Sequence, residues 1–287
     1  MTSSIKKISE MNSQELIEKY GGNGYWWFYE LVLTVEDVKN VTNVILNGGN
    51  RAQHKLGFVR SEITDDSIKE VAEMLKVDNS LTHIAIEETP ISHDSIKLLC
   101  DALKSNKTVL ILELYFINVT DDDVQELAEM LKFNKALREL RMERNQITDR
   151  GVKMLADVLS NHNSTLVLLA LSYNKITDDG AAEFSEMLKV NKTFEELQIG
   201  DNQIGDQGMK MLCDVLTTGG GDGGNRTLTF LYMNRNQITD ESVDKIVEMI
   251  IVNDNLKRLH LADMQISEAG FDRIYTARGT KSMQIIK

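Results

Sequence analysis

The stretch LRELRMERNQITDRGVKMLADVL, residues 137–159, contains the pattern that decides the fold. In its first half Leu140 and Met142 alternate with charged residues, as in a short strand with one buried face. In its second half apolar residues recur at the spacing of one helical stripe: Val152, Leu155, Ala156 and Leu159. The stretch therefore predicts one strand followed by one helix, each with a single apolar side.

The same unit recurs along most of the chain. Aligned on one buried position, the equivalent residues are Ile63, Ile91, Val119, Ile147, Ile176, Ile204, Ile238 and Ile266. Successive members lie 28 residues apart, except for one step of 29 and one of 34. Repetition at so regular a step predicts eight stacked strand–helix units, each burying its apolar side against the next.

Polar residues mark where each helix begins and ends. A hydroxyl residue that can cap the helix follows most of these anchors: Thr64, Ser92, Thr120, Thr148, Thr177, Thr239 and Ser267. The next residue is mostly an acid, which the helix dipole favours: Asp65, Asp121, Asp149, Asp178, Asp206 and Asp240. Before the next strand stands Asn106, Asn134, Asn163, Asn191, Asn225 or Asn253. Because asparagine tolerates the left-handed conformation, we expect it to end the helix in that conformation.

These residues resemble the ribonuclease-inhibitor-like leucine-rich repeat, L-x-x-L-x-L-x-x-N-x-I followed by a helix, over about residues 53–287. The asparagine of that pattern is present as Asn145, Asn174, Asn202 and Asn236, and is replaced by Ser61, Thr89, Ile117 and Met264. In the family this side chain bonds loop backbone, so the resemblance implies looser turns in the other units. It also implies an α/β fold, a leucine-rich-repeat solenoid or horseshoe with a parallel sheet on the concave face and helices on the convex face.

The domain organisation follows from the repeats. We expect residues 1–22 to form a polar flank with a short helix near residues 13–20, and residues 23–287 to form the solenoid. A degenerate first repeat at about 23–52 places Trp26 and Phe28 at strand leucine positions, where aromatic bulk can cap the exposed core. Eight repeats at about 53–279 and a terminal strand at about 281–287 complete the solenoid.

The net charge of −12 argues against a nucleic-acid partner and against adsorption to an anionic membrane. No stretch approaches the roughly 18 apolar residues needed to span a bilayer, and the N-terminus has no apolar core of the signal-peptide type. Two cysteines are too few for a secreted disulfide scaffold. We therefore expect a cytoplasmic protein.

The inner face of the array is the candidate binding site. Parallel strands stack about 4.8 Å apart whereas packed helices need roughly 8–10 Å, so the array must curve with its strands inside. The exposed inner positions predicted to bind a partner protein are Glu113, Tyr115, Phe116, Arg141, Glu143, Arg144, Tyr173, Tyr232, Arg235 and His260. Aromatic residues and arginine dominate protein-interface energies. The alternative is that Glu113, Arg141, Glu143 and Arg144 only pair across strands of a solvated sheet.

Other patterns give no support for catalysis, a cofactor, a metal ion or a small-molecule substrate. Cys100 and Cys213 share one helical core position four repeats apart and predict buried thiols rather than a disulfide. No two of the five histidines share a helix at the spacing of metal ligands. The glycine-rich run at 217–227 lacks the lysine of a phosphate-binding loop, and at 219–224 it reads as a flexible insertion.

The sequence thus predicts a non-catalytic protein–protein interaction module: a scaffold, a sensor or an inhibitor. Similar repeats form the sensing ends of nucleotide-binding innate-immune receptors and the whole of ribonuclease inhibitor. One alternative is an actin-binding cytoskeletal regulator, because SEMLKVNKTFEELQIGDN, residues 185–202, resembles the tropomodulins; their tropomyosin-binding N-terminal half is lacking. A second alternative is a GTPase-activating protein similar to the Ran GTPase activator, whose additional repeats and acidic tail are also lacking.

Overall fold

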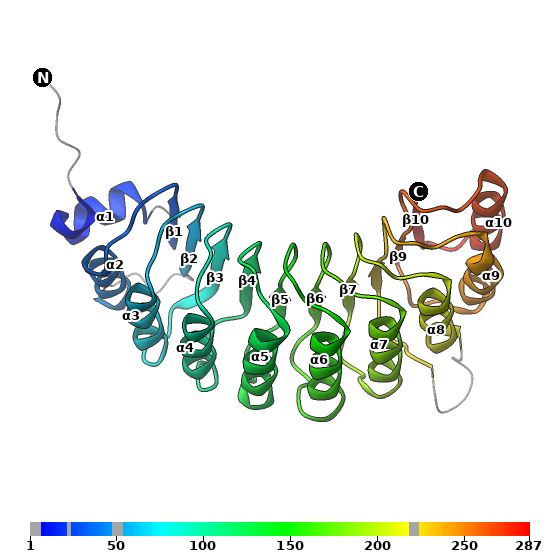
Figure 1. Ribbon diagram of the computed structural model, residues 1–287, viewed down its shortest axis with the longest axis horizontal. Helices are drawn as coiled ribbons and strands as arrows, with labels where there is room; N and C mark the ends of the chain where they lie inside the picture. The colour runs from blue at the N-terminus through cyan, green and yellow to red at the C-terminus, as the bar shows by residue number, and fades with distance from the viewer. Residues whose placement is uncertain (1–6, 22–23, 48–53, 218–223) are drawn as a thin grey trace, which may run out of the picture.

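The computed structural model describes residues 7–21, 24–47, 54–217 and 224–287. Within them, ten parallel strands form one sheet in chain order, β1 to β10, and a helix follows nearly every strand. Figure 1 shows the array curving, with the strands on the concave side and the helices on the convex side. The predicted parallel-sheet horseshoe is confirmed. The predicted glycine-rich insertion lies mostly outside the described residues.

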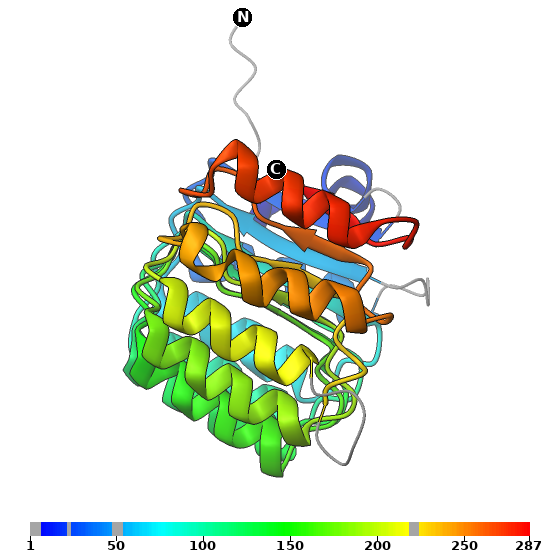
Figure 2. The same cartoon turned by 90° about the vertical axis from the view of Figure 1, so that its right-hand side faces the viewer.

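The strands are short and shorten further after the fourth. Their bounds are β1 (Tyr25–Tyr29), β2 (His54–Val59), β3 (Leu81–Glu87), β4 (Ile111–Tyr115), β5 (Glu139–Arg141), β6 (Leu168–Ala170), β7 (Glu196–Gln198), β8 (Phe230–Tyr232), β9 (Arg258–His260) and β10 (Gln284–Ile286). The helices are η1 (Ile8–Glu10), α1 (Ser13–Lys19), α2 (Val35–Asn47), α3 (Asp65–Leu75), α4 (His93–Leu103), α5 (Asp121–Phe133), α6 (Asp149–Asn161), α7 (Asp178–Val190), α8 (Asp206–Thr217), η3 (Asp240–Ser242), α9 (Val243–Val252) and α10 (Glu268–Arg278). Figure 2 shows the helices stacked side by side over the strands.

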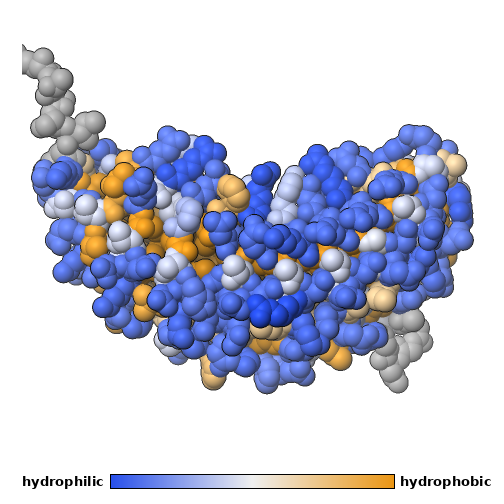
Figure 3. All heavy atoms as spheres, viewed as in Figure 1, coloured by the Kyte–Doolittle hydropathy of each residue, from blue (hydrophilic) through white to orange (hydrophobic). Residues whose placement is uncertain are grey.

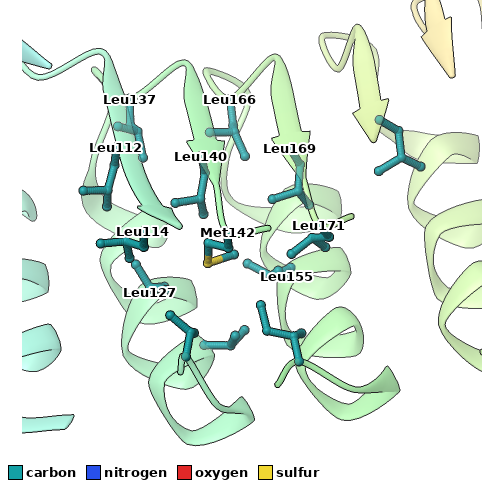
Figure 4. Close-up of a cluster of buried hydrophobic side chains, with 14 of the residues drawn as sticks. Leu112, Leu114, Leu127, Leu137, Leu140, Met142, Leu155, Leu166, Leu169 and Leu171 are labelled. Atoms are coloured by element: carbon teal, nitrogen blue, oxygen red, sulfur yellow. The ribbon is translucent and has the colours of Figure 1, made fainter. Parts of the chain in front are cut away.

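The core is a continuous layer between sheet and helices. The sheet register places equivalent leucines of successive repeats directly beside one another, such as Leu112, Leu140 and Leu169. Each of them is at most 1% exposed, as are the helix residues Leu127 and Leu155 that face them. Figure 4 shows these side chains interdigitating between neighbouring repeats. Each unit is thus stabilised by apolar contact with the units on either side.

The loop asparagines form a ladder between repeats. The Asn145 Nδ2 donates to the Leu114 carbonyl of the preceding repeat (2.8 Å), and its Oδ1 accepts from the Val119 amide (2.9 Å). Asn174, Asn202 and Asn236 make corresponding bonds. At the first of the substituted positions the Ser61 hydroxyl bonds the Phe28 carbonyl and the Leu31 amide. A hydroxyl therefore replaces the asparagine there, and the looser turn expected at that position is not observed.

The asparagines that end the helices correct one prediction. Their backbone is extended rather than left-handed, with φ of −65° at Asn134 and −72° at Asn191. They are buried, and each bonds in two directions. The Asn163 Nδ2 donates to the Leu131 carbonyl at the end of α5 (2.9 Å), and its Oδ1 accepts from the Leu166 amide (2.9 Å). The asparagine is needed for these side-chain bonds, which join a helix end of one repeat to the corner of the next, and not for its tolerance of positive φ.

The acids at the helix starts also join repeats. Six of the seven predicted hydroxyl caps are confirmed, since Thr177 and its equivalents accept bonds from amides of the first helical turn. The Thr120 hydroxyl instead donates to the Asp123 carboxylate. In addition, the Asp149 carboxylate of the preceding repeat accepts from the Thr177 amide (2.8 Å), the Thr177 hydroxyl (2.7 Å) and the Gly180 amide (2.9 Å). A Cβ at Gly180 would lie 2.5 Å from the Asp149 Oδ1, so the glycine is required for this close approach.

The N-terminal end is closed by aromatic and aliphatic side chains. Trp26 and Phe28 of β1 are 3% and 0% exposed, and the Phe28 ring stacks on Phe58 at 5.7 Å between ring centroids. The described part of the flank buries Leu16 completely and Met11 almost completely against the same core. The flank therefore adds apolar packing that its polar composition did not predict. The division of the chain at residue 22 stays a prediction.

Candidate functional site

The concave face is made of every second residue of the strands. In β4 Leu112 and Leu114 point into the core, whereas Ile111, Glu113 and Tyr115 are partly exposed on the inner side. The register then aligns columns of inner residues: Glu113, Arg141, Ala170, Gln198, Tyr232 and His260 form one of them. The predicted strand residues are therefore brought to one face, and Figure 3 shows the hollow that this face lines.

One inner column was missed by sequence reasoning. It lies eight residues before each anchor and contains Lys55, His83, Ile111, Glu139, Leu168, Glu196, Phe230 and Arg258. The signal was present, because the alternation that identifies the strand extends two residues further toward its start. Glu139 and Arg258 of this column contact predicted site residues, and Phe230 contacts Arg258.

At the N-terminal end of the face, one side chain reaches across two strands. The Trp27 ring covers Gly57, where a Cβ would lie only 1.9 Å from the ring. The same ring meets His83 edge-on at 6.0 Å between centroids. The His83 Nε2 lies 3.0 Å from the Glu113 Oε2. Because Gly57 has no side chain, the Trp27 ring can cover β2 at this point and contact His83, which lies beside Glu113.

Three carboxylates crowd the middle of the face. Glu87, Glu113 and Glu143 line a recess of about 150 Å³ together with Tyr115 and Arg141. Burial raises the pKa of Glu143 and of Glu87, and for Glu87 the charge of Glu113 adds to this effect. Burial also acts on Glu113, but its hydrogen bond with His83 and the charges of His83 and Arg141 outweigh it and lower its pKa. Of the three carboxylates, Glu113 is therefore the one that keeps its negative charge to the lowest pH.

We expect the variant Glu143→Gln to be more stable than the wild type at neutral pH. A carboxyl whose pKa is raised on folding binds its proton more tightly when folded, so its contribution falls as pH rises through the folded pKa. Relieving a penalty on the order of 1 kcal/mol would raise Tm by about 2–4 °C. Thermal unfolding at pH 7.5 and 4.5 should show this gain at the higher pH only.

The control is Glu195→Gln, which removes the same charge from an exposed side chain. A gain of equal size in this control, or a Glu143→Gln gain that is independent of pH, would contradict burial as the cause.

A first aromatic–arginine cluster lies beside this recess. The Arg144 guanidinium lies over the Tyr173 ring (4.4 Å to its centroid) and over the Tyr115 ring (6.0 Å). The Tyr173 hydroxyl accepts a bond from the Arg235 Nη1 (3.0 Å). Phe116, the residue after Tyr115, is 49% exposed. Four predicted site residues thus form one connected surface cluster, and Phe116 follows it directly in the chain.

A second cluster lies toward the C-terminal end. The Arg258 Nη1 donates to the Tyr232 hydroxyl (2.8 Å), and its guanidinium lies 5.6 Å from the Phe230 ring centroid. His260 meets the Tyr232 ring edge-on at 5.8 Å between centroids. Burial and the charge of Arg258 lower the pKa of His260, which favours the neutral imidazole. Four strand spacings, about 19 Å, separate Tyr232 from Tyr115, so the predicted residues form two clusters rather than one.

Some of the predicted charged residues form ion pairs within the sheet, and others contact aromatic rings. Arg141 is paired with Glu139 (2.6 Å) and more loosely with Glu113 of the neighbouring strand (3.6 Å), as the alternative of cross-strand pairing expects. Arg144 instead contacts aromatic rings.

Phe116, Arg144, Tyr173 and Arg235 occupy one unusual backbone position. In every repeat the residue three before the anchor is left-handed, with φ between 48° and 58°. The nine residues are Glu30, Arg60, Glu88, Phe116, Arg144, Tyr173, Asp201, Arg235 and Asp263. Glycine would adopt this conformation freely, whereas a residue with a Cβ is disfavoured by roughly 1–2 kcal/mol. Large side chains are thus displayed along the rim of the face against a backbone preference.

The convex side offers a different kind of surface. A groove of about 760 Å³ runs between α5 and α6, lined by Glu126, Glu129, Lys132 and Asp157 among others. Lys132 is already paired with Glu129 of its own helix. Such long, solvated charged side chains give a weaker basis for recognition than the aromatic clusters.

Cys100 and Cys213 are buried with free thiols, and burial raises the pKa of both. Across the described ranges, no group of three or more histidine, cysteine, aspartate or glutamate side chains is placed to hold a metal ion. In the same part of the chain, no helix is both long and apolar enough to cross a membrane.

Comparison with known proteins identifies the repeats. A leucine-rich-repeat family model matches residues 133–156, 162–185, 190–213 and 224–247. NACHT, LRR and PYD domains-containing protein 9C of Mus musculus is 30% identical over 120 residues, which are 42% of this chain and 12% of that protein. Ribonuclease inhibitor of Sus scrofa is 29% identical over 86 residues, 30% of this chain and 18% of that protein. The chain thus spans less than a fifth of either relative.

A solved structure of a known protein shares the fold. An internalin from Listeria monocytogenes aligns with a TM-score of 0.50 and 17% identity, over 90% of this chain and 71% of that chain. The structure titled leiomodin-1 actin-binding site 2 gives a TM-score of 0.44 and 17% identity, over 56% of this chain and 88% of that one. A likeness as low as the second carries no argument about actin.

Proposed function

We propose that this chain, a solenoid of leucine-rich repeats, is a non-catalytic protein-interaction module that binds a partner protein on its concave face. It would act in the cytoplasm as a scaffold, a sensor or an inhibitor. The observation that carries the proposal is the pair of aromatic–arginine clusters, around Arg144 and around Arg258, on one continuous inner surface. Aromatic and arginine side chains supply most of the binding energy of protein interfaces.

The residues with left-handed backbone along the edge of the concave face support this proposal independently. A surface under no demand for particular side chains would favour glycine or asparagine at a position of positive φ. Here that position holds Phe116, Arg144 and Tyr173 in three successive repeats. Phe116 is 49% exposed and Tyr173 is 38% exposed, so neither is kept for the core. Exposed aromatic side chains in adjacent repeats are typical of a contact surface.

The proposal is tested by site-specific crosslinking. A photoreactive phenylalanine analogue is placed at Phe116 on the concave rim or, as the matched control, at Phe133 at the end of α5, which is 59% exposed. After illumination in cell extract, we expect a discrete protein adduct from position 116 and none from position 133. An adduct formed only from position 133 would move the binding site to the helices and refute the proposal.

A further inference from the structure

The five arginines of the inner face differ in what neutralises them. Three are paired with carboxylates of the chain itself: Arg60 with Glu88 (2.9 Å), Arg141 with Glu139 (2.6 Å) and Arg235 with Asp263 (3.0 Å). Among the described residues, Arg144 and Arg258 form no such ion pair: Arg144 lies over aromatic rings, and Arg258 donates to a tyrosine hydroxyl and to a glutamine side chain. Within this part of the chain the two guanidiniums are therefore without a direct ion pair, and the nearest effect of a carboxylate is at longer range, where the hydrogen bond from Arg60 and then the charge of Arg144 help to lower the pKa of Glu88.

Both guanidiniums are nevertheless held in place by neutral groups. Arg144 lies over the rings of Tyr115 and Tyr173. Arg258 donates from Nε and Nη2 to the Gln284 side-chain oxygen (3.1 and 3.0 Å) and from Nη1 to the Tyr232 hydroxyl. Aromatic faces and an amide oxygen orient a cation without cancelling its charge. Each arginine is thus preorganised, and an incoming carboxylate would not have to displace an existing ion pair.

We propose, on the basis of the function proposed above, that the partner contributes an acidic segment whose carboxylates bind Arg144 and Arg258. The two arginines are four strands apart and five residues apart along the strand direction, which gives a separation of about 25 Å. An extended chain covers that distance in roughly 7–8 residues. The preferred ligand is therefore an extended segment with two acids at about this spacing, and with apolar side chains between them for Tyr173 and Phe230.

The net charge of −12 predicts a preference for basic ligands, which is the opposite of the preference that the proposed contact predicts. Nonspecific attraction to this protein would select basic peptides, which the recess at Glu87, Glu113 and Glu143 would also favour. A preference for acidic peptides would instead require that the carboxylates of the peptide bind Arg144 and Arg258. The composition of selected ligands therefore separates the proposed contact from general electrostatics.

The test is selection from a displayed library of random 16-residue peptides. The full chain is compared with the double variant Arg144→Gln and Arg258→Gln, and with the control Arg60→Gln and Arg150→Gln, which has the same charge change at two arginines paired with carboxylates outside the two aromatic–arginine clusters. We expect wild type and control to select peptides with two acids about 7–8 residues apart. For the best peptide, we expect the double variant to lose at least 30-fold in affinity by fluorescence anisotropy, and the control less than threefold.

The failure of this inference is distinguishable from failure of the proposed function. Basic or neutral peptides that crosslink at position 116 would refute the acidic partner while leaving the concave binding face intact. Equal losses in both double variants would also refute the special role of Arg144 and Arg258. Selected peptides that crosslink only at position 133, or no selected peptide at all, would count against both.

Discussion

Replacing Asn163 with alanine is expected to lower the free energy of unfolding by about 3–5 kcal/mol. The side chain is 2% exposed and joins two repeats. Its Nδ2 donates to the carbonyls of Leu131 and Asn134, and its Oδ1 accepts from the amides of Thr165 and Leu166. Alanine leaves these buried backbone groups without a partner, and each such group costs about 1–3 kcal/mol.

The matched control is Asn161→Ala, two residues away in the same corner. Asn161 is exposed, and its side chain bonds only the Asp157 carbonyl of its own helix. Urea denaturation followed by circular dichroism should give a loss below about 0.5 kcal/mol for this surface change. Similar losses in the two variants would contradict the assignment of stability to the inter-repeat bonds.

Tryptophan fluorescence adds a second measurement on the same samples. Both tryptophans, Trp26 and Trp27, lie in β1 and therefore report on the N-terminal end alone. If the ladders couple the repeats, fluorescence and circular dichroism follow one transition in the wild type. A repeat array weakened at Asn163 can unfold on one side first, which would separate the two transitions.

The sequence predicted the repeating elements because apolar spacing alone determines them. Leu140 and Met142 must alternate in a strand, and Leu155 and Leu159 must share a helical stripe, wherever the rest of the chain lies. The concave face followed from geometry, since strands pack more closely than helices. These features depend on local periodicity and on stacking, which single-chain patterns express directly.

The errors arise where a side chain bonds another repeat. Asn163 was assigned a left-handed backbone because local propensity allows it, whereas its bonds to Leu131 and Leu166 require an extended one. The sequence also did not show which arginines pair with carboxylates and which contact aromatic rings. Whether Arg141 pairs with Glu139, or Arg144 lies over Tyr173, depends on side-chain orientation across strands. Spacing along the chain does not determine such contacts.

The combined substitution of Tyr115, Arg141 and Tyr232 by alanine is expected to abolish partner binding. Tyr115 and Tyr232 belong to the two different aromatic–arginine clusters, and Arg141 lies on the strand after Tyr115. Truncating a central aromatic or arginine side chain in an interface costs about 2 kcal/mol or more. Three such losses give at least a hundredfold weaker binding even if they are far from additive.

Stability is expected to change little in this variant, because all three side chains are partly exposed and none belongs to the core. The matched control replaces Phe133, Arg150 and Tyr275 by alanine, which removes the same residue classes from exposed positions on the helices. Thermal unfolding of both variants should remain close to that of the wild type.

The most direct test of the concave binding face is the dissociation constant of the partner captured at position 116, measured by titration against these three proteins. The account predicts at least a hundredfold increase for the Tyr115, Arg141 and Tyr232 variant and less than a twofold change for the helix-side control. An unchanged dissociation constant in the first variant, with its fold intact, would contradict the account.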